Sequence, residues 1–205
     1  MAAQWLKQTG WITVLASGLA LGWHSLGQAV QLANGQVYFD RPPRLVDSSV
    51  LRDRTAAPNV GYFFSLEVPA DAGEPLQSVA IAQRDGETFT REIEYELDET
   101  EAFVGTRRRR GADLPVATTT WDDETNTAVV TFDPPVPPGT DLTIRLEAER
   151  NPRRSGIYLF GITAYPAGAD PYGQFLGYGR LHFYDSGNDS IFDSRWQGDR
   201  PFSIH

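Results

Sequence analysis

The sequence predicts an all-β protein, a single-domain antiparallel β-sandwich of the immunoglobulin-like kind with about eight or nine strands. Apolar and polar residues alternate with a period of two along much of the chain, whereas the 3.6-residue period of amphipathic helices is scarce. The 205 residues include 19 glycines and 14 prolines, and 12% are aromatic. This composition is typical of turn-rich domains with aromatic cores. The length suits one domain with a substantial hydrophobic core.

The first element is a leader at residues 1–29 rather than a strand. Lys7 is followed by an apolar run at residues 11–23, and a Gly-Gln-Ala sequence with small residues at the cleavage positions ends the segment. A run of about 13 residues is short of the ~20 that span a bilayer as a helix. We therefore predict a cleaved secretory signal peptide. An uncleaved signal anchor over residues 5–26 is the alternative.

Nine later segments carry strand patterns. The clearest is residues 92–97, where three glutamates alternate with Ile93, Tyr95 and Leu97. The glutamates should face water and the apolar residues the core. The run at 157–165 is more continuously apolar and predicts a central strand covered on both faces. The nine predicted strands lie near residues 36–39, 60–68, 78–84, 92–97, 116–121, 128–132, 142–148, 157–165 and 180–184.

Two connections between these strands have distinct sequences. The polar segment 122–127 separates two strand patterns by the length of a hairpin loop, so a β-hairpin is predicted there. The segment 133–139 contains four prolines, none of which can donate a ladder hydrogen bond. We expect it to be a sheet-free crossover or an edge.

The domain organisation follows from this pattern. Residues 30–184 contain no internal repeat, low-complexity tract or long linker, which predicts one β-sandwich domain. Residues 185–205 are polar with isolated aromatic side chains and form a C-terminal extension. We expect this extension to cover the core, with contact to a partner as the alternative.

Several blocks of the sequence together resemble a known family. They lie at residues 36–39, 42–46, 73–76, 132–139 and 172–184. In these blocks the chain resembles the exported cyanobacterial domain-of-unknown-function family numbered 2808, over roughly residues 30–184. The resemblance implies a cyanobacterial source and a cell-envelope location. It implies no catalytic or binding residue, because the family's function is unknown.

Charge and residue usage exclude several classes of protein. Cysteine is absent, which removes disulfides, thiolate metal sites and a cysteine nucleophile. The net charge is −9, which argues against a protein that coats nucleic acid. Lys7 is the one lysine, so the chain after the leader has only arginine as a permanent cation. We predict no cofactor.

The residues that could carry catalysis are few. His182 and His205 are the histidines after the leader, and no Gly-x-Ser-x-Gly sequence accompanies them. His182 should lie on the strand face opposite Leu181 and Phe183, which favours a surface histidine. We predict no catalytic residue and a protein that is not an enzyme. A hydrolase that uses His182 or paired carboxylates is the alternative.

A metal site is also not predicted. Asp185, Asn188, Asp189 and Asp193 lie close together, and their oxygens would suit Ca²⁺. Their spacing does not match an EF-hand loop. A solvated loop is the preferred interpretation, with an irregular calcium site as the alternative.

Positive charge is concentrated in the run of Arg107, Arg108, Arg109 and Arg110, which we expect on a loop. Such a run can hold phosphate or an acidic glycan. The simpler interpretation is neutralisation by residues 84–101, which hold eight acids and two arginines. Recognition of an anionic envelope polymer or an envelope protein is the functional hypothesis.

Two tyrosines are the second candidate binding group. Tyr172 and Tyr178 lie in a stretch with three glycines that does not match a dinucleotide-binding motif. The glycines should permit bulges or close backbone approach. The aromatic rings should pack, or alternatively present a surface to sugar or protein.

These inferences converge on an exported, periplasmic or secreted envelope protein. It should act without catalysis, by binding or supporting another envelope component through exposed loops. The expected partner is an envelope protein or an anionic envelope polymer, with no nucleic acid and no membrane span after leader removal. A carbohydrate-binding module is the first alternative and a hydrolase the second.

Overall fold

The computed structural model describes residues 30–31, 35–84 and 93–185. These residues form strands and connecting turns, with no helix among them. Within this described part, there is accordingly no helix long and apolar enough to cross a membrane. The strands are β1 (Val30–Gln31), β2 (Val37–Tyr38), β3 (Arg44–Val50), β4 (Pro58–Glu67), β5 (Leu76–Arg84), β6 (Tyr95–Thr106), β7 (Arg109–Leu114), β8 (Val116–Asp122), β9 (Thr127–Val136), β10 (Asp141–Arg150), β11 (Gly156–Pro166) and β12 (Gln174–Phe183).

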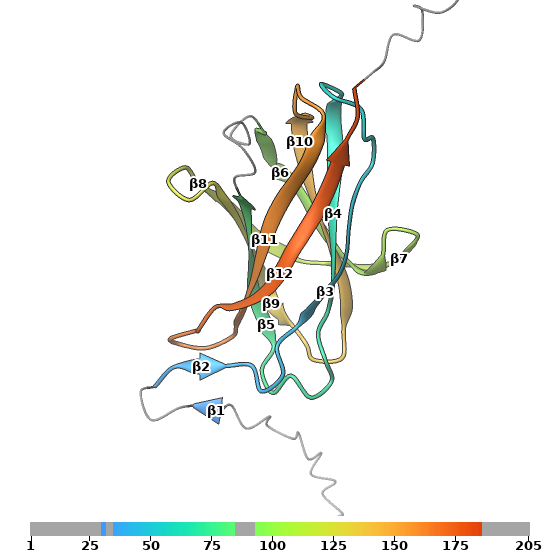
Figure 1. Cartoon of the computed structure of the whole chain (residues 1–205). Helices are drawn as coiled ribbons and strands as arrows, with labels where there is room; N and C mark the ends of the chain where they lie inside the picture. The colour runs from blue at the N-terminus through green and yellow to red at the C-terminus, as the bar shows by residue number, and fades with distance from the viewer. Residues whose placement is uncertain (1–29, 32–34, 85–92, 186–205) are drawn as a thin grey trace, which may run out of the picture.

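Two antiparallel sheets of five strands pack face to face. The first sheet has the order β3-β4-β10-β6-β7 and the second the order β12-β11-β5-β9-β8. The short strands β1 and β2 pair with each other, at one end of the sandwich in Figure 1. The prediction of an all-β, immunoglobulin-like antiparallel sandwich is confirmed.

The two sheets hold ten strands, of which eight were predicted, because the ninth predicted segment, at residues 36–39, corresponds to β2 outside the two sheets. The additional strands are β3 and β7, which both lie at sheet edges. β3 contains Asp47, Ser48 and Ser49, and β7 begins with two arginines. Edge strands need only one ladder and one covered face, so their sequences lack the apolar alternation that predicts central strands.

The core lies between the sheets and is rich in aromatic rings, as the composition predicts. Tyr62, Phe64 and Phe160 are fully buried. The Phe160 ring meets the rings of both Tyr62 and Phe64 edge to face. The Tyr62 hydroxyl donates to Asn151 Oδ1 at 3.0 Å. Burial raises the pKa of Tyr62, so this hydroxyl stays protonated and remains a hydrogen-bond donor.

The predicted hairpin is confirmed, but the prolines after it are placed differently. β8 and β9 pair antiparallel on either side of residues 123–126. β9 continues through Pro134 and Pro135 to Val136, so this segment is not free of the sheet. The ladder between β5 and β9 shifts register there, between Leu76 and Ser78. The two prolines thus fall where no ladder hydrogen bond is required of them.

Two further strand predictions are confirmed with changed boundaries. Ile93 is buried while Glu94 and Glu96 are exposed, as the alternation requires, although β6 runs on to Thr106. β12 begins at Gln174, and the register of its ladder with β11 shifts beside Gly177, which is the bulge that the glycine-rich stretch predicts. Residues 1–29, 92 and 186–205 lie outside the described part, and with them the leader, Glu92 and most of the extension.

Candidate functional site

The outer face of the first sheet is covered by the sheet's own β6–β7 hairpin. The turn of this hairpin reaches past β10 and β4 to β3, where Arg107 Nη1 donates to the Val50 carbonyl at 3.0 Å. Figure 1 shows β7 emerging on the far side of β3 and β4. Phe63 and Phe103, which face outward, are consequently only 7% and 1% exposed.

A glycine allows the hairpin to fold this tightly. Gly105 has a φ of +89°, in the left-handed region that favours glycine. A Cβ at this position would also overlap the carbonyl oxygen of Arg109 across the turn. The hairpin ladder shifts register between Phe103 and Gly105. The sequence Val-Gly-Thr before the arginine run therefore sets where the arginines lie.

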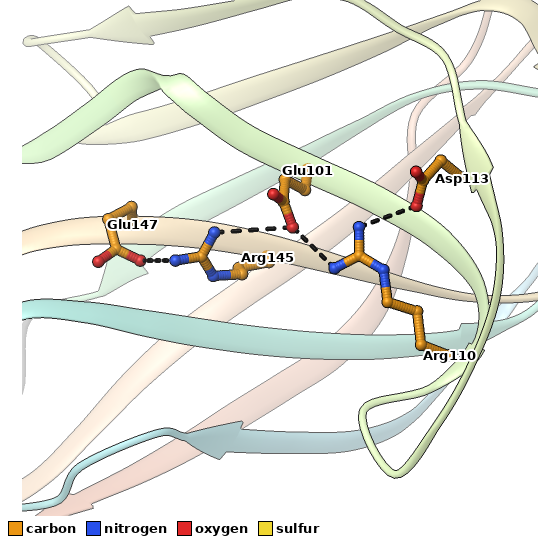
Figure 2. Close-up of polar contacts among 5 residues, drawn as sticks. All are labelled: Glu101, Arg110, Asp113, Arg145 and Glu147. Carbon is orange, nitrogen blue, oxygen red and sulfur yellow. Dashed lines mark hydrogen bonds and ion pairs between the residues drawn. The ribbon is translucent and has the colours of Figure 1, made fainter.

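A network of charged groups holds the hairpin to the sheet (Figure 2). Glu101 Oε2 accepts from Arg110 Nη1 at 2.9 Å and lies 3.6 Å from Arg145 Nη1. Arg110 Nη2 contacts Asp113 at 2.8 Å, and Arg145 pairs with Glu147. The hydrogen bonds to Asp113 and Glu101 raise the pKa of Arg110. Two guanidinium groups are thus matched by three carboxylates.

The aromatic rings beneath the hairpin bind its arginines as well. The Arg107 guanidinium carbon lies 5.3 Å from the centre of the Phe63 ring, and that of Arg110 lies 4.6 Å from the centre of the Phe103 ring. Both distances are within cation–π range. Arg107 and Arg110 are therefore fixed by contacts within the chain.

The four arginines do not lie on one loop, which corrects the prediction that the whole run forms a loop. Arg107 and Arg108 lie in the turn, whereas Arg109 and Arg110 belong to β7. The register explains this, because Thr106 pairs directly with Arg109 and leaves two residues for the turn. Arg110 contacts Glu101 of the acidic segment. Arg108 and Arg109 are exposed and form no ion pair within the described residues.

A hollow of about 370 Å³ lies between the hairpin turn and β3, and we call it the hairpin hollow. Ser65 lines it from β4, and it is 6% exposed. Its hydroxyl contacts Thr143 Oγ1 at 2.9 Å, and Thr143 Oγ1 donates to the Gly105 carbonyl at 2.7 Å. The hollow is lined by Val46, Asp47, Ser49, Ser65, Thr106, Arg107 and Arg108.

The two candidate tyrosines lie elsewhere, in separate ring pairs. Tyr172 stacks on Tyr38 at 4.7 Å between ring centres, and Tyr178 meets Phe175 edge to face at 5.1 Å. Both tyrosines are about half exposed, at 47% and 52%. Tyr178 is on β12 of the second sheet, so the structure does not bring it together with the arginines.

His182 is exposed on β12, with Leu181 and Phe183 buried on either side, as predicted. It lines a hollow that Ser48 and Asp53 also line. The Ser48 hydroxyl accepts from the Arg180 amide at 2.9 Å and donates to the Arg180 carbonyl at 3.3 Å. This hydroxyl joins β3 to β12 and has its proton committed to a backbone carbonyl.

Sequence reasoning missed a third hollow, of about 450 Å³, between β6 and β8. Its aromatic wall is Tyr95 and Trp121, whose ring centres are 5.5 Å apart. Trp121 Nε1 donates to Asp123 at 2.8 Å, which fixes the indole ring. Burial raises the pKa of Tyr95. No group of three or more metal-ligating side chains occurs among residues 30–31, 35–84 and 93–185.

Comparisons with solved structures find β-sandwich domains of bacterial surface proteins. The collagen-binding domain of a Staphylococcus aureus adhesin is 11% identical, with a TM-score of 0.37, over 69% of this chain and 96% of that one. The major pilin SpaD of Corynebacterium diphtheriae is 12% identical, with a TM-score of 0.44, over 67% of this chain and 34% of the pilin. The collagen-binding subdomain of the Enterococcus faecalis surface protein ACE is 10% identical, with a TM-score of 0.38, over 70% of this chain and 98% of that one.

These likenesses concern the fold alone. Among curated proteins, none matches the sequence at a significant level. A family model does match, over residues 36–183, which is more than half of the chain and includes every strand of the two sheets. The protein therefore belongs to the family described as a protein of unknown function, DUF2808.

Proposed function

We propose that this protein is an exported, non-enzymatic binding module of the cell envelope that holds an anionic group of another envelope component in the hairpin hollow. The observation that carries the proposal is the pair of arginines on one wall of this hollow. Arg107 is fixed by Val50 and Phe63, and Arg108 beside it is exposed without an ion pair among the described residues. A fixed guanidinium beside a free one is a preorganised anion site.

The surrounding charge favours a specific contact over general attraction. The chain carries −9 overall, so an anionic polymer is repelled from most of its surface. Binding at the hairpin hollow then depends on short-range contacts with Arg107 and Arg108. Export rests on the leader pattern of residues 1–29, and a cyanobacterial source rests on the family resemblance. Both stay predictions.

The alternatives have weaker support. A hydrolase needs a nucleophile activated by His182. Ser48 and Ser49 both line its hollow, but the Ser48 hydroxyl is bonded to the Arg180 backbone, and within the described residues neither serine is hydrogen-bonded to His182. A carbohydrate-binding platform needs neighbouring exposed rings, and Tyr172 and Tyr178 each pack against a different partner. Tyr178 with Phe175 is the pair that such a platform would use.

The test is co-sedimentation of the full chain with isolated envelope fragments across a salt series. Arg108→Gln and Arg109→Gln remove the same charge from adjacent positions, but only Arg108 lines the hairpin hollow. We expect binding at low salt that Arg108→Gln abolishes and Arg109→Gln largely retains. An equal loss of binding in the two variants, or binding that does not change with salt concentration, would contradict a site in the hairpin hollow.

A further inference from the structure

We propose that the hairpin hollow recognises a carboxylate flanked by hydroxyl groups, the chemistry of a uronic-acid unit in an acidic polysaccharide. This inference rests on the proposed function, because it assigns a ligand class to the same hollow. It follows from counting which groups around the hollow can still donate a hydrogen bond and which can only accept one.

The donors lie on the hairpin side. One Nη of Arg107 is occupied by the Val50 carbonyl, and its guanidinium is held over Phe63, which leaves its other N–H groups on a rigid frame. Arg108 adds a second guanidinium at the rim of the hollow. Together they can hold a carboxylate by charge-assisted hydrogen bonds.

The most buried residue of the lining, Ser65, is an acceptor. Thr143 has one hydroxyl proton, and it is donated to the Gly105 carbonyl. The contact between Thr143 and Ser65 at 2.9 Å must therefore use the proton of Ser65. Ser65 has no second proton to offer a ligand, so its remaining lone pair makes it an acceptor in the hollow.

The β3 wall adds a stronger acceptor. Asp47 lines the hollow, is exposed, and forms no ion pair within the described residues. An ionised carboxylate accepts hydrogen bonds and cannot donate them. The hollow thus has guanidinium donors on the hairpin side and Asp47 and Ser65 as acceptors. The Ser49 and Thr106 hydroxyls, which also line it, can donate or accept and so do not distinguish one anion from another.

This division of donors and acceptors selects among anions. A fully ionised phosphate or sulfate presents only acceptor oxygens, so it is repelled by Asp47 and finds no donor at Ser65. A uronic acid presents its carboxylate to Arg107 and Arg108 and its hydroxyl protons to Asp47 and Ser65. The hydroxylated carboxylate satisfies both walls at once.

Isothermal titration calorimetry of the full chain tests this with trigalacturonate and tripolyphosphate as probes. We expect trigalacturonate to bind more tightly although tripolyphosphate carries more charge. Asp47→Asn should weaken trigalacturonate about fivefold, since a hydrogen bond to a charged group is replaced by a neutral one, and should strengthen tripolyphosphate. Ser65→Ala should weaken trigalacturonate about threefold. A melting temperature close to that of the parent chain checks that each variant is folded.

The outcomes separate the two proposals. Tripolyphosphate binding as tightly as trigalacturonate, or trigalacturonate affinity that is unchanged in Asp47→Asn, would overturn the uronic-acid assignment and leave the anion site standing, provided that Arg108→Gln abolishes binding. If neither probe shows binding that depends on Arg108, both proposals fail. Arg109→Gln is the control in every titration, because it changes the net charge by the same amount as Arg108→Gln and Arg109 does not line the hairpin hollow.

Discussion

The outer faces of the two sheets differ in what covers them and in their charge. On the first sheet, Glu101, Arg145 and Glu147 lie under or beside the β6–β7 hairpin and pair with one another. On the second sheet, Ala80 is an uncharged outward position between Thr163 and Val129. The outward arginines of this sheet, Arg84 and Arg180, form no ion pair among the described residues. The covered face is thus the one whose ionic groups are paired.

This difference indicates what the charges do. Burying a charge is unfavourable unless it is paired, so a covered face with ions is stable only in the register that pairs them. A slip of the hairpin by one residue would turn Arg110 away from Glu101. The ion pairs therefore specify how the hairpin lies on the sheet. Among the described residues no hairpin covers the outer face of the second sheet, where Ile157, Phe175 and Tyr178 are exposed.

The largest expected effect comes from the turn that lets the hairpin cover the sheet. Gly105→Ala would force a Cβ against the Arg109 carbonyl at a φ of +89°, and we expect it to lower the free energy of unfolding by about 3 kcal/mol. Gly177→Ala on β12 is the matched control, because its φ is +123° and no atom lies within 4 Å of the new Cβ.

For Gly177→Ala we expect a loss of about 1 kcal/mol, from backbone conformation alone. Urea unfolding of both variants measures the difference. Hydrogen exchange should show faster exchange in the hairpin of Gly105→Ala. If the two substitutions cost the same, the hairpin does not depend on a tight turn at Gly105.

A smaller effect is expected from the ion pairs themselves. Arg145→Met leaves Glu147 without its partner, and the Glu147 side chain is only 11% exposed, so we expect a loss of about 2 kcal/mol. Arg180→Met removes an exposed arginine of the second sheet and should change stability by less than about 0.5 kcal/mol. Thermal and urea unfolding of the two variants sharpen the comparison of the faces. Equal effects would mean that pairing under the hairpin contributes no stability.

The fold was largely predictable because period-two alternation is a local signal. Leu142, Ile144 and Leu146 alternate with polar residues, and all three are buried in β10 as that pattern requires. The covering of the first sheet was not predictable in this way. The contact of Arg107 with Val50 joins residues 57 positions apart, and alternation does not show what lies over the outer face of a strand.

One signal for the covering was nevertheless present in the sequence. Phe63 occupies the face of β4 that alternation assigns to solvent, and Phe103 does the same on β6. Large aromatic residues at two such positions indicate that another element covers that face. The hairpin hollow, by contrast, depends on β3, whose short polar sequence carries no strand pattern, so its lining could not be assembled from residue spacing.

The smallest effect concerns a carboxylate held by a turn instead of by arginine. Asp122, in the β8–β9 hairpin of the second sheet, accepts bonds from the Thr125 hydroxyl and from the amides of Thr125 and Glu124. These bonds, the Thr125 hydroxyl first, lower the pKa of Asp122 below its ordinary 3.8. The ionised form is therefore favoured by folding.

The sign of the pH effect follows. Stability from Asp122 is present in full above the unfolded pKa near 3.8, and it is lost as the pH falls through the lower folded value. Thr125→Val removes the first of the bonds, so the pKa of Asp122 measured by NMR titration should rise toward 3.8. Since Arg145 and Glu101 lie on the opposite sheet, Arg145→Met should leave this titration unchanged. A shift in that variant would mean that the two faces are electrostatically coupled through the core.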